Sequence, residues 1–206
     1  MTLMTEQPTI SGVEPESFEE LLDILDELNL RDGFKAEIYR GKIVVSPWSK
    51  GYYHRVMEQV CDQLRPGLPQ DHLLSIGPFL YVFPGDESAY GPDIHAAHQQ
   101  VFETVSNHLD GEALVFVAEL TSRVTRTDDL TDKVAVYGRA GVPIYLLLDM
   151  QEQQSTVFWA PSAAGYESHC TQPFGEALHI PKPFDCTLDT TGFRAPQEEA
   201  DDQPET

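Results

Sequence analysis

Two carboxylates and one lysine are the residues of this sequence whose types and positions could act together in catalysis. Glu119 lies at the second-to-last position of the run ALVFVAEL, whose other residues are apolar. A buried carboxylate is costly unless it pairs with a cation. Asp93 begins another expected strand, and Lys133 lies in the helix expected after Glu119. Carboxylates at neighbouring strand ends can share a divalent cation. An ammonium group beside them can position a water molecule or stabilise developing negative charge.

Each of these residues also has an ordinary structural explanation. Asp93 could cap a turn. Glu119 could form an ion pair with Arg123 or Arg126, and Lys133 could be an exposed helix lysine. Spacing alone therefore leaves both a metal site and a structural role open.

The elements that must position these residues are the strands and helices of one mixed sheet. Apolar residues at helical spacing predict helices over 18–30, 50–65 and 129–140. Strands are expected over 35–39, 42–46, 73–83, 92–97, 113–120, 144–148, 155–160 and 177–180. The strand over 73–83 should bend near Gly77, and the last two strands should lie around a turn at Gly165. Residues 98–112 are expected to form a polar connection. The strand–helix–strand order of 113–148 indicates a right-handed parallel crossover. The sequence therefore predicts an α/β or α+β domain, a mixed central sheet flanked by helices, with an N-terminal helix and edge hairpins.

The length and composition suit a single globular domain. The chain has 206 residues, of which 41% are hydrophobic. It has no apolar run of the ~20 residues that span a bilayer and no secretory signal at its start, so no membrane partner is expected. Three cysteines without a CxxC motif predict a reducing, cytoplasmic location. We expect a flexible segment over 1–16, a domain over 17–190 and an acidic disordered tail over 191–206.

The strong negative charge argues against a protein that coats nucleic acid. Thirty-four acidic residues against 13 Lys and Arg give a net charge of −21. Many of the acidic residues lie in 14–27 and 198–205, where a solvated helix face and a disordered tail are the simplest interpretations. The common nucleotide-binding and hydrolase motifs, GxxxxGK[ST], GxGxxG, HExxH and GxSxG, are absent from the sequence.

The order Pro92-Asp93, Glu119 and then a lysine resembles the PD-(D/E)XK nuclease superfamily. More closely, residues 34–185 resemble the Uma family of predicted restriction endonucleases. The matching residues are Glu37, Arg40-Gly41, Ser46-Pro47, His54, Pro92-Asp93, Glu119, Ser122, Thr125-Arg126, Asp129, Lys133, Tyr137, Gly141-Val142, Tyr145 and Asp149. The sequence departs from the superfamily pattern at Thr121, which stands where the (D/E)XK lysine is expected, so the lysine would come from the following helix as Lys133.

The resemblance implies a restriction-endonuclease-like fold and Mg²⁺- or Mn²⁺-dependent hydrolysis of DNA. Asp93 and Glu119 would be metal ligands, and Lys133 would orient or activate the attacking water. Glu37 would be an outer-sphere acid or a ligand of a second metal. His54, Thr121 and Arg126 would have auxiliary roles. Arg126 and Arg123 would contact phosphates. For His54 we favour a surface position beside Glu58.

Two other classes of function compete with this hypothesis. One is a catalytically weak or inactive nuclease fold that acts as an interaction or regulatory module, which the charge of −21 would suit. The other is a metal-dependent hydrolase of small phosphoesters. The joint presence of Asp93, Glu119 and Lys133 favours an enzyme, and we expect weak, salt-sensitive DNA binding and a homodimer.

Overall fold

The computed structural model describes residues 15, 17–77, 79–121 and 126–194. Most of the predicted flexible N-terminus and acidic tail, together with Arg123, lie outside these residues. Within these ranges, no helix has both the length and the apolar character that crossing a membrane requires.

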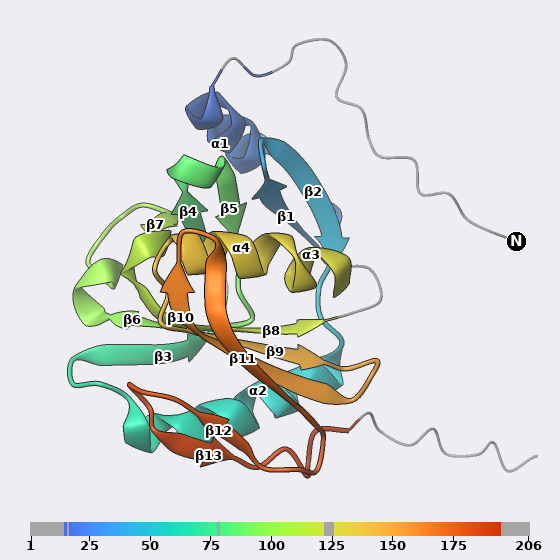
Figure 1. The fold of residues 1–206 in the computed structure, drawn as a ribbon. Coiled ribbons are helices and arrows are strands. Elements are labelled where there is room, and N and C mark those ends of the chain that lie inside the picture. The colour runs from blue at the N-terminus through green and yellow to red at the C-terminus, as the bar shows by residue number, and fades with distance from the viewer. Residues whose placement is uncertain (1–14, 16, 78, 122–125, 195–206) are drawn as a thin grey trace, which may run out of the picture.

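A six-stranded mixed sheet forms the centre of the fold (Figure 1). Its strands, in spatial order, are β11 (Gly165–Pro173), β10 (Gln154–Ser162), β9 (Ile144–Asp149), β8 (Leu114–Thr121), β6 (Ile94–His98) and β3 (His72–Ile76). β8 and β9 are parallel, and the chain between them forms α3 (Arg126–Leu130) and α4 (Asp132–Arg139). All other neighbours in this sheet are antiparallel.

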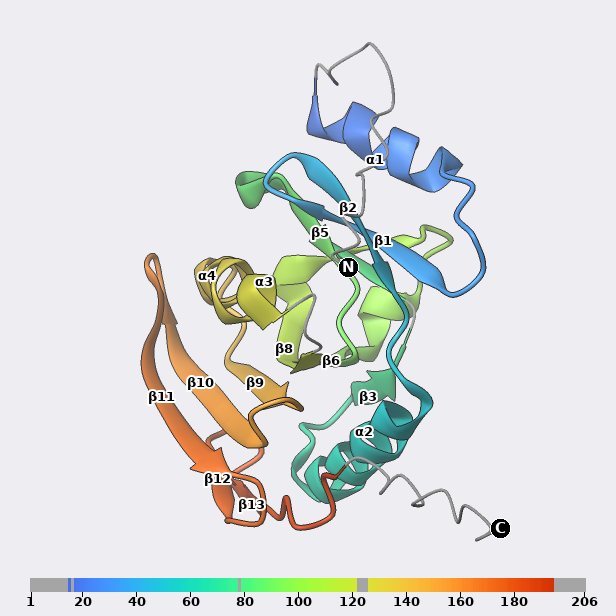
Figure 2. The same cartoon turned by 90° about the vertical axis from the view of Figure 1, so that its right-hand side faces the viewer.

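A second, five-stranded sheet lies on the α4 side of the first. Its order is β2 (Lys42–Pro47), β1 (Phe34–Tyr39), β5 (Ser88–Tyr90), β4 (Leu80–Phe83) and β7 (His108–Asp110). The helix α1 (Phe18–Glu27) covers the outer side of this sheet, at the end of the molecule away from α2 (Figure 2). The hydroxyl of Ser17 caps α1 by accepting a hydrogen bond from the backbone N–H of Glu20.

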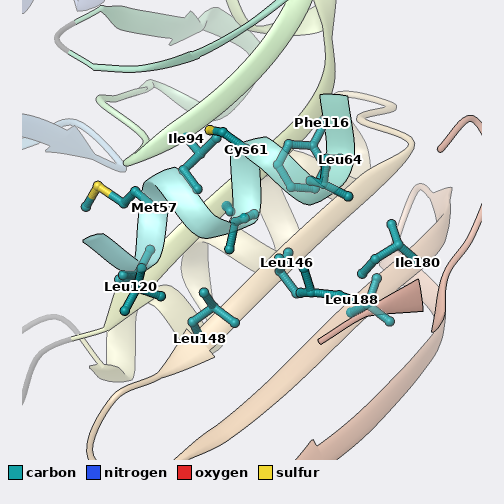
Figure 3. Close-up of a cluster of buried hydrophobic side chains, with 14 of the residues drawn as sticks. Met57, Cys61, Leu64, Ile94, Phe116, Leu120, Leu146, Leu148, Ile180 and Leu188 are labelled. Atoms are coloured by element: carbon teal, nitrogen blue, oxygen red, sulfur yellow. The ribbon is translucent and has the colours of Figure 1, made fainter. Parts of the chain in front are cut away.

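One face of the six-stranded sheet packs against α2 (Gly51–Leu64) and the short β12–β13 ladder (Leu178–Ile180 and Cys186–Leu188). The apolar spacing along α2 directs its buried stripe at the sheet. Figure 3 shows this cluster, in which α2 lies over side chains of β6, β8 and β9, with Ile180 of β12 and Leu188 of β13 beside them. Its labelled members are Met57, Cys61, Leu64, Ile94, Phe116, Leu120, Leu146, Leu148, Ile180 and Leu188.

The opposite face packs against α4 and the inner side of the five-stranded sheet, and it is rich in aromatic residues. Its buried members include Tyr39, Tyr81, Phe83, Tyr90, Val117, Val136, Tyr137, Tyr145 and Leu147. Because side chains alternate along a strand, Val117, Glu119 and Thr121 of β8 face this side, while Phe116, Ala118 and Leu120 face α2. This alternation directs Glu119 into the space between the two sheets.

The predicted mixed α/β architecture is confirmed, with four corrections to its elements. The expected strand over 73–83 is two strands, β3 and β4, in different sheets. The expected helix over 129–140 is two short helices, α3 and α4. The connection over 98–112 contains the strand β7.

The fourth correction concerns the two strands expected around the Gly165 turn. β10 is an interior strand whose hairpin partner is β11, and 177–180 contains β12, which pairs with β13 in a separate ladder. β11 lies at the edge of the sheet, and along most of its length its side chains alternate between half-buried and exposed. This strand was not predicted from the sequence because such a strand lacks the buried apolar residues that mark an interior strand.

Candidate active site

Glu119 and Lys133 form a buried ion pair at the end of β8. The Nζ of Lys133 lies 2.8 Å from Oε1 of Glu119, and the hydroxyl of Tyr137 donates to the same oxygen at 3.0 Å. Lys133 and Tyr137 are four residues apart on α4, so they occupy one face of the helix. The second oxygen of Glu119, Oε2, makes no hydrogen bond to the described residues.

Lys133 joins three acidic side chains from different elements. Besides Glu119, its Nζ lies 3.2 Å from Oδ1 of Asp129 and 3.5 Å from Oε1 of Glu37. The Lys133 side chain is only 1% exposed, so it is not a surface helix lysine. The alternative pairing of Glu119 with Arg126 is wrong, because Arg126 Nε lies 2.6 Å from Oδ2 of Asp149.

Glu37 connects β1 to the loop that precedes Asp93. Its Oε1 accepts a hydrogen bond from the backbone N–H of Gly91 at 2.9 Å, and its Oε2 lies 3.4 Å from the Nζ of Lys35. Burial raises the pKa of Glu37, but the charges of Lys133 and Lys35 together with the Gly91 hydrogen bond outweigh it, so the pKa is below its usual value. Glu37 is therefore an ionised carboxylate that fixes its neighbours.

Asp93 is held at the end of β8 by contacts distant in the sequence. Its Oδ2 accepts a hydrogen bond from the backbone N–H of Leu120 at 2.8 Å, and its Oδ1 accepts one from the hydroxyl of Ser49 at 3.2 Å. These partners differ from those of a local turn cap. Since Leu120 directly follows Glu119, the hydrogen bond brings Asp93 to the same strand end as Glu119.

The site contains more carboxylates than ammonium groups. Glu37, Asp93, Glu119 and Asp129 face the charges of Lys35 and Lys133. Burial, with the nearby charges of Asp129 and Asp93, outweighs Lys133 and raises the pKa of Glu119 to about 8. For Lys133, burial lowers the pKa, but Glu119 and Glu37 outweigh it and hold the pKa well above its usual value. An additional cation would balance this excess of negative charge.

The donor chemistry of the site fits Mg²⁺ or Mn²⁺. Both prefer oxygen ligands, and Mg²⁺ keeps several waters while using one or two carboxylates of the protein. Asp93 and Glu119 would supply such a pair. In the part of the chain that the structure describes, no group of three or more His, Cys, Asp or Glu side chains is arranged to hold a metal ion.

A cleft of about 200 Å³ lies beside Asp93. It is lined by Lys35, Trp48, Ser49, Lys50, Gly51, His54, Met57, Gly77, Gly91, Pro92 and Asp93. Lys35 therefore reaches the cleft that Asp93 lines, whereas Lys133 is absent from the lining. The Nζ of Lys35 also donates to the carbonyl of Gly91 at 3.1 Å.

The three auxiliary candidates take different positions. His54 is exposed at the cleft, with Nε2 3.5 Å from Oε1 of Glu58, as the surface interpretation predicts. Thr121 is buried, and its Oγ1 has no hydrogen-bond partner among the described residues. Arg126 is partly exposed and held by Asp149.

Sequence reasoning gave no role to Lys35, Asp129 or Ser49. For Lys35 a signal existed: it lies two residues before Glu37 on a predicted strand, and residues so spaced face the same side. Asp129 belongs to the run of matching residues, but only the helix geometry shows that it contacts Lys133. Nothing local marks Ser49, whose contact with Asp93 is formed by the tertiary fold.

Comparisons with known proteins agree with this fold. A sequence model of the Uma2 family, described as "Putative restriction endonuclease", matches residues 16–191. Among solved structures, the chain is similar to the crystal structure of a "putative nuclease belonging to DUF820" from Anabaena variabilis. The TM-score is 0.62 at 17% sequence identity, and the match covers 82% of this chain and 92% of that chain. The comparison with curated proteins gave no match.

Proposed function

The chain belongs to the Uma2 family, and we propose that it is a metal-dependent endonuclease that hydrolyses phosphodiester bonds of DNA. The observation that carries the proposal is the arrangement of Asp93 and Glu119 at one strand end, beside a cleft and within a cluster that has excess negative charge. A buried cluster of this kind contributes little to stability, and perturbed carboxylates beside a cleft are typical of functional sites.

Asp93 and Glu119 would hold Mg²⁺ or Mn²⁺. When bound, the ion would neutralise charge on the phosphate and lower the pKa of a bound water. The protein's own residues then have separate tasks. Lys133 orients Glu119 through the 2.8 Å contact, and its charge opposes the rise in the pKa of Glu119 that burial causes. Glu37 has no free position for a ligand in this arrangement, and it acts in the outer sphere by fixing Gly91 and Lys35.

Lys35 supplies the ammonium group that faces the substrate. It lines the cleft with Asp93, whereas Lys133 is enclosed by its three acidic partners. The pKa of Lys35 is raised: burial lowers it, but the charges of Glu37, Glu119 and Asp93 together outweigh the burial. Lys35 therefore stays charged, and it would contact a phosphate oxygen and stabilise the negative charge that develops as water attacks.

The partner, location and assembly belong to the same proposal. DNA would bind weakly because the net charge of −21 repels a polyanion, and the binding would weaken further with salt. We also propose a cytoplasmic location and a homodimer.

The test is cleavage of plasmid and single-stranded DNA at low salt with Mg²⁺ or Mn²⁺, and with EDTA. The wild type should cut and EDTA should stop it. Glu119→Gln and Lys35→Gln should each lower the rate at least about 100-fold, the order seen when one group that stabilises transition-state charge is removed. Glu167→Gln, the same change at an exposed position of β11, should cut at the wild-type rate.

If the wild type and all variants are equally inactive on DNA, the proposal fails and an interaction module replaces it. If only small phosphoesters are cleaved, the site is a metal-dependent hydrolase of another substrate class.

A further inference from the structure

The cleft beside Asp93 has two lysines in its lining, in a strongly acidic protein. Lys35, Lys50 and His54 line it together with a single acidic side chain, Asp93. Two acidic side chains contact this lining from outside it: Glu37, 3.4 Å from the Nζ of Lys35, and Glu58, 3.5 Å from Nε2 of His54. The protein as a whole has a net charge of −21. Lys50 forms no ion pair with the described residues, so its ammonium group is available to attract an anionic strand that most of the surface repels.

Trp48 places a large aromatic ring at the same cleft. Trp48 follows β2, lines the cleft and is 54% exposed. Its backbone N–H donates to the carbonyl of Gly33 at 2.8 Å, so the backbone is fixed while the ring remains accessible. Exposed aromatic rings beside a basic groove are the surfaces on which unpaired bases stack.

The cleft is small and has open space near its glycines. Its volume of about 200 Å³ is below the ~300–1,000 Å³ of pockets that enclose drug-sized ligands. A Cβ placed on Gly51 or Gly77 would meet no atom within 4 Å. Such a cleft suits one base or one nucleotide. A base that remains paired and stacked within a duplex cannot present its face to Trp48.

The start of α2 adds a further favourable feature. Its N-cap is Lys50, which makes no side-chain capping hydrogen bond, and Gly51 begins the helix at the cleft. The first backbone N–H groups of a helix lack partners within the helix, and they favour a nearby anion. Lys50 and this helix start lie next to Trp48 in the sequence, so one short segment offers both a ring and positive charge.

We propose that the substrate strand is single-stranded DNA, with an unpaired base stacked on Trp48 beside the phosphate at Asp93. This inference rests on the proposed function and deepens it by naming the substrate class. Lys50 and the start of α2 contact the flanking phosphate, and Lys35 faces the phosphate at Asp93. Trp48 is a binding residue in this arrangement.

Binding measured apart from cleavage tests the inference. The probes are a short fluorescein-labelled thymidine oligonucleotide, its duplex with the complementary strand, and the uridine RNA of equal length. Fluorescence anisotropy at low salt is recorded in Ca²⁺, with strand integrity checked on a gel. The wild type should bind the single DNA strand more tightly than the duplex or the RNA. Trp48→Ala should weaken this binding about tenfold, and Trp48→Phe should restore most of it.

Phe34→Ala is the matched control. Phe34 is also an exposed aromatic of this hairpin, paired with Pro47 across the two strands, but it does not line the cleft. This variant should bind like the wild type. Because Trp48 and Phe34 are both exposed, neither truncation removes core packing.

The outcomes separate this inference from the proposed function. If Trp48→Ala binds like the wild type, or if the duplex or the RNA binds as tightly as the single DNA strand, the inference is wrong even when the protein cuts DNA. If binding depends on Trp48 but neither Mg²⁺ nor Mn²⁺ supports cleavage, the inference holds and the endonuclease proposal fails. If no nucleic acid binds, both are wrong.

Discussion

The two faces of the six-stranded sheet differ in the kinds of side chain that they bury. On the side of α2, β8 contributes Phe116, Ala118 and Leu120 to an apolar cluster (Figure 3). On the side of α4, the same strand contributes Val117 and Glu119, and Glu119 meets the buried Lys133. One strand therefore serves packing on one face and the candidate active site on the other.

The apolar and the charged side chains contribute differently to the stability of the fold. Burial of apolar side chains stabilises a fold by about 25 cal/mol per Å² removed from water. Buried ion pairs contribute little net stability, because the cost of removing charges from water offsets their attraction. The apolar clusters on both faces therefore stabilise the fold, whereas the buried charges of the α4 face add little to stability and suit the proposed chemistry.

Removal of the shared cation should have the largest effect on the α4 face. Lys133→Ala leaves Glu37, Glu119 and Asp129 without their common ammonium partner, and it should lower the free energy of unfolding by about 3–5 kcal/mol. Urea unfolding monitored by circular dichroism measures this. Lys42→Ala, at an exposed position of β2, is the control and should change stability little. A loss below about 1 kcal/mol for Lys133→Ala would show that the three carboxylates do not need the ammonium group of Lys133 to remain buried.

A cavity on the α2 face should cost about 3 kcal/mol. Leu146 is fully buried in the apolar cluster, and Leu146→Ala removes contacts that no neighbour replaces. The same urea titration measures the loss, and DNA cleavage per folded molecule should stay at the wild-type level. A selective loss of cleavage in this variant would contradict the separation of the two faces.

The histidine on the α4 side should make stability depend on pH. His95 is buried against Phe79, Tyr81 and Phe102, and its ring nitrogens have no hydrogen-bond partner among the described residues. Burial lowers its pKa from 6.5 to about 4. The unfolded chain therefore binds a proton between pH 6.5 and pH 4 that the folded chain does not.

This proton should lower the free energy of unfolding by about 3 kcal/mol as the pH falls from 7 to 4. Nearby carboxylates titrate in the same range, so the informative quantity is the difference between wild type and His95→Leu. Over this pH range the free energy of unfolding of His95→Leu should fall less than that of the wild type, by the amount given above. Equal decreases for both proteins would show that His95 is not responsible.

Glu119→Gln should have the smallest effect on stability. Lys133 keeps Glu37 and Asp129 as partners in this variant. Burial raises the pKa of Glu119 to about 8, so at neutral pH folding must protonate this carboxyl, which costs free energy that a glutamine avoids. Loss of the Lys133 contact offsets part of this gain, so stability should rise by up to about 1 kcal/mol. Thermal unfolding without metal measures this. A clear fall in the melting temperature would identify Glu119 as a structural ion-pair partner.

The sequence predicted the parts of the fold that repeat a strong local pattern. The stripe of α2 and the apolar run of β8 are visible in the sequence because burial fixes their spacing. β5 has three residues, too few for a pattern. The apolar run over 73–83 divides between two sheets, and its hydrophobicity alone cannot show where the chain leaves one sheet for the other.

The candidate site was predictable in its residue types but incompletely in its contacts. Asp93, Glu119 and Lys133 stand out by their surroundings in the sequence and by the family resemblance. Their roles stay predictions. That Lys133 contacts Glu37 and that Lys35 reaches the cleft depend on how the five-stranded sheet packs over α4. Such packing brings together residues about 100 positions apart, for which the local sequence carries no signal.

The central claim is that Asp93 and Glu119 hold a divalent metal ion, and a crystal soaked with Mn²⁺ tests it most directly. Anomalous diffraction locates manganese independently of any assumption about the site. The account predicts a peak at the end of β8 within coordination distance, about 2.0–2.6 Å, of one carboxylate oxygen from each residue. No peak there at saturating Mn²⁺, or a peak bound only elsewhere, would contradict the account.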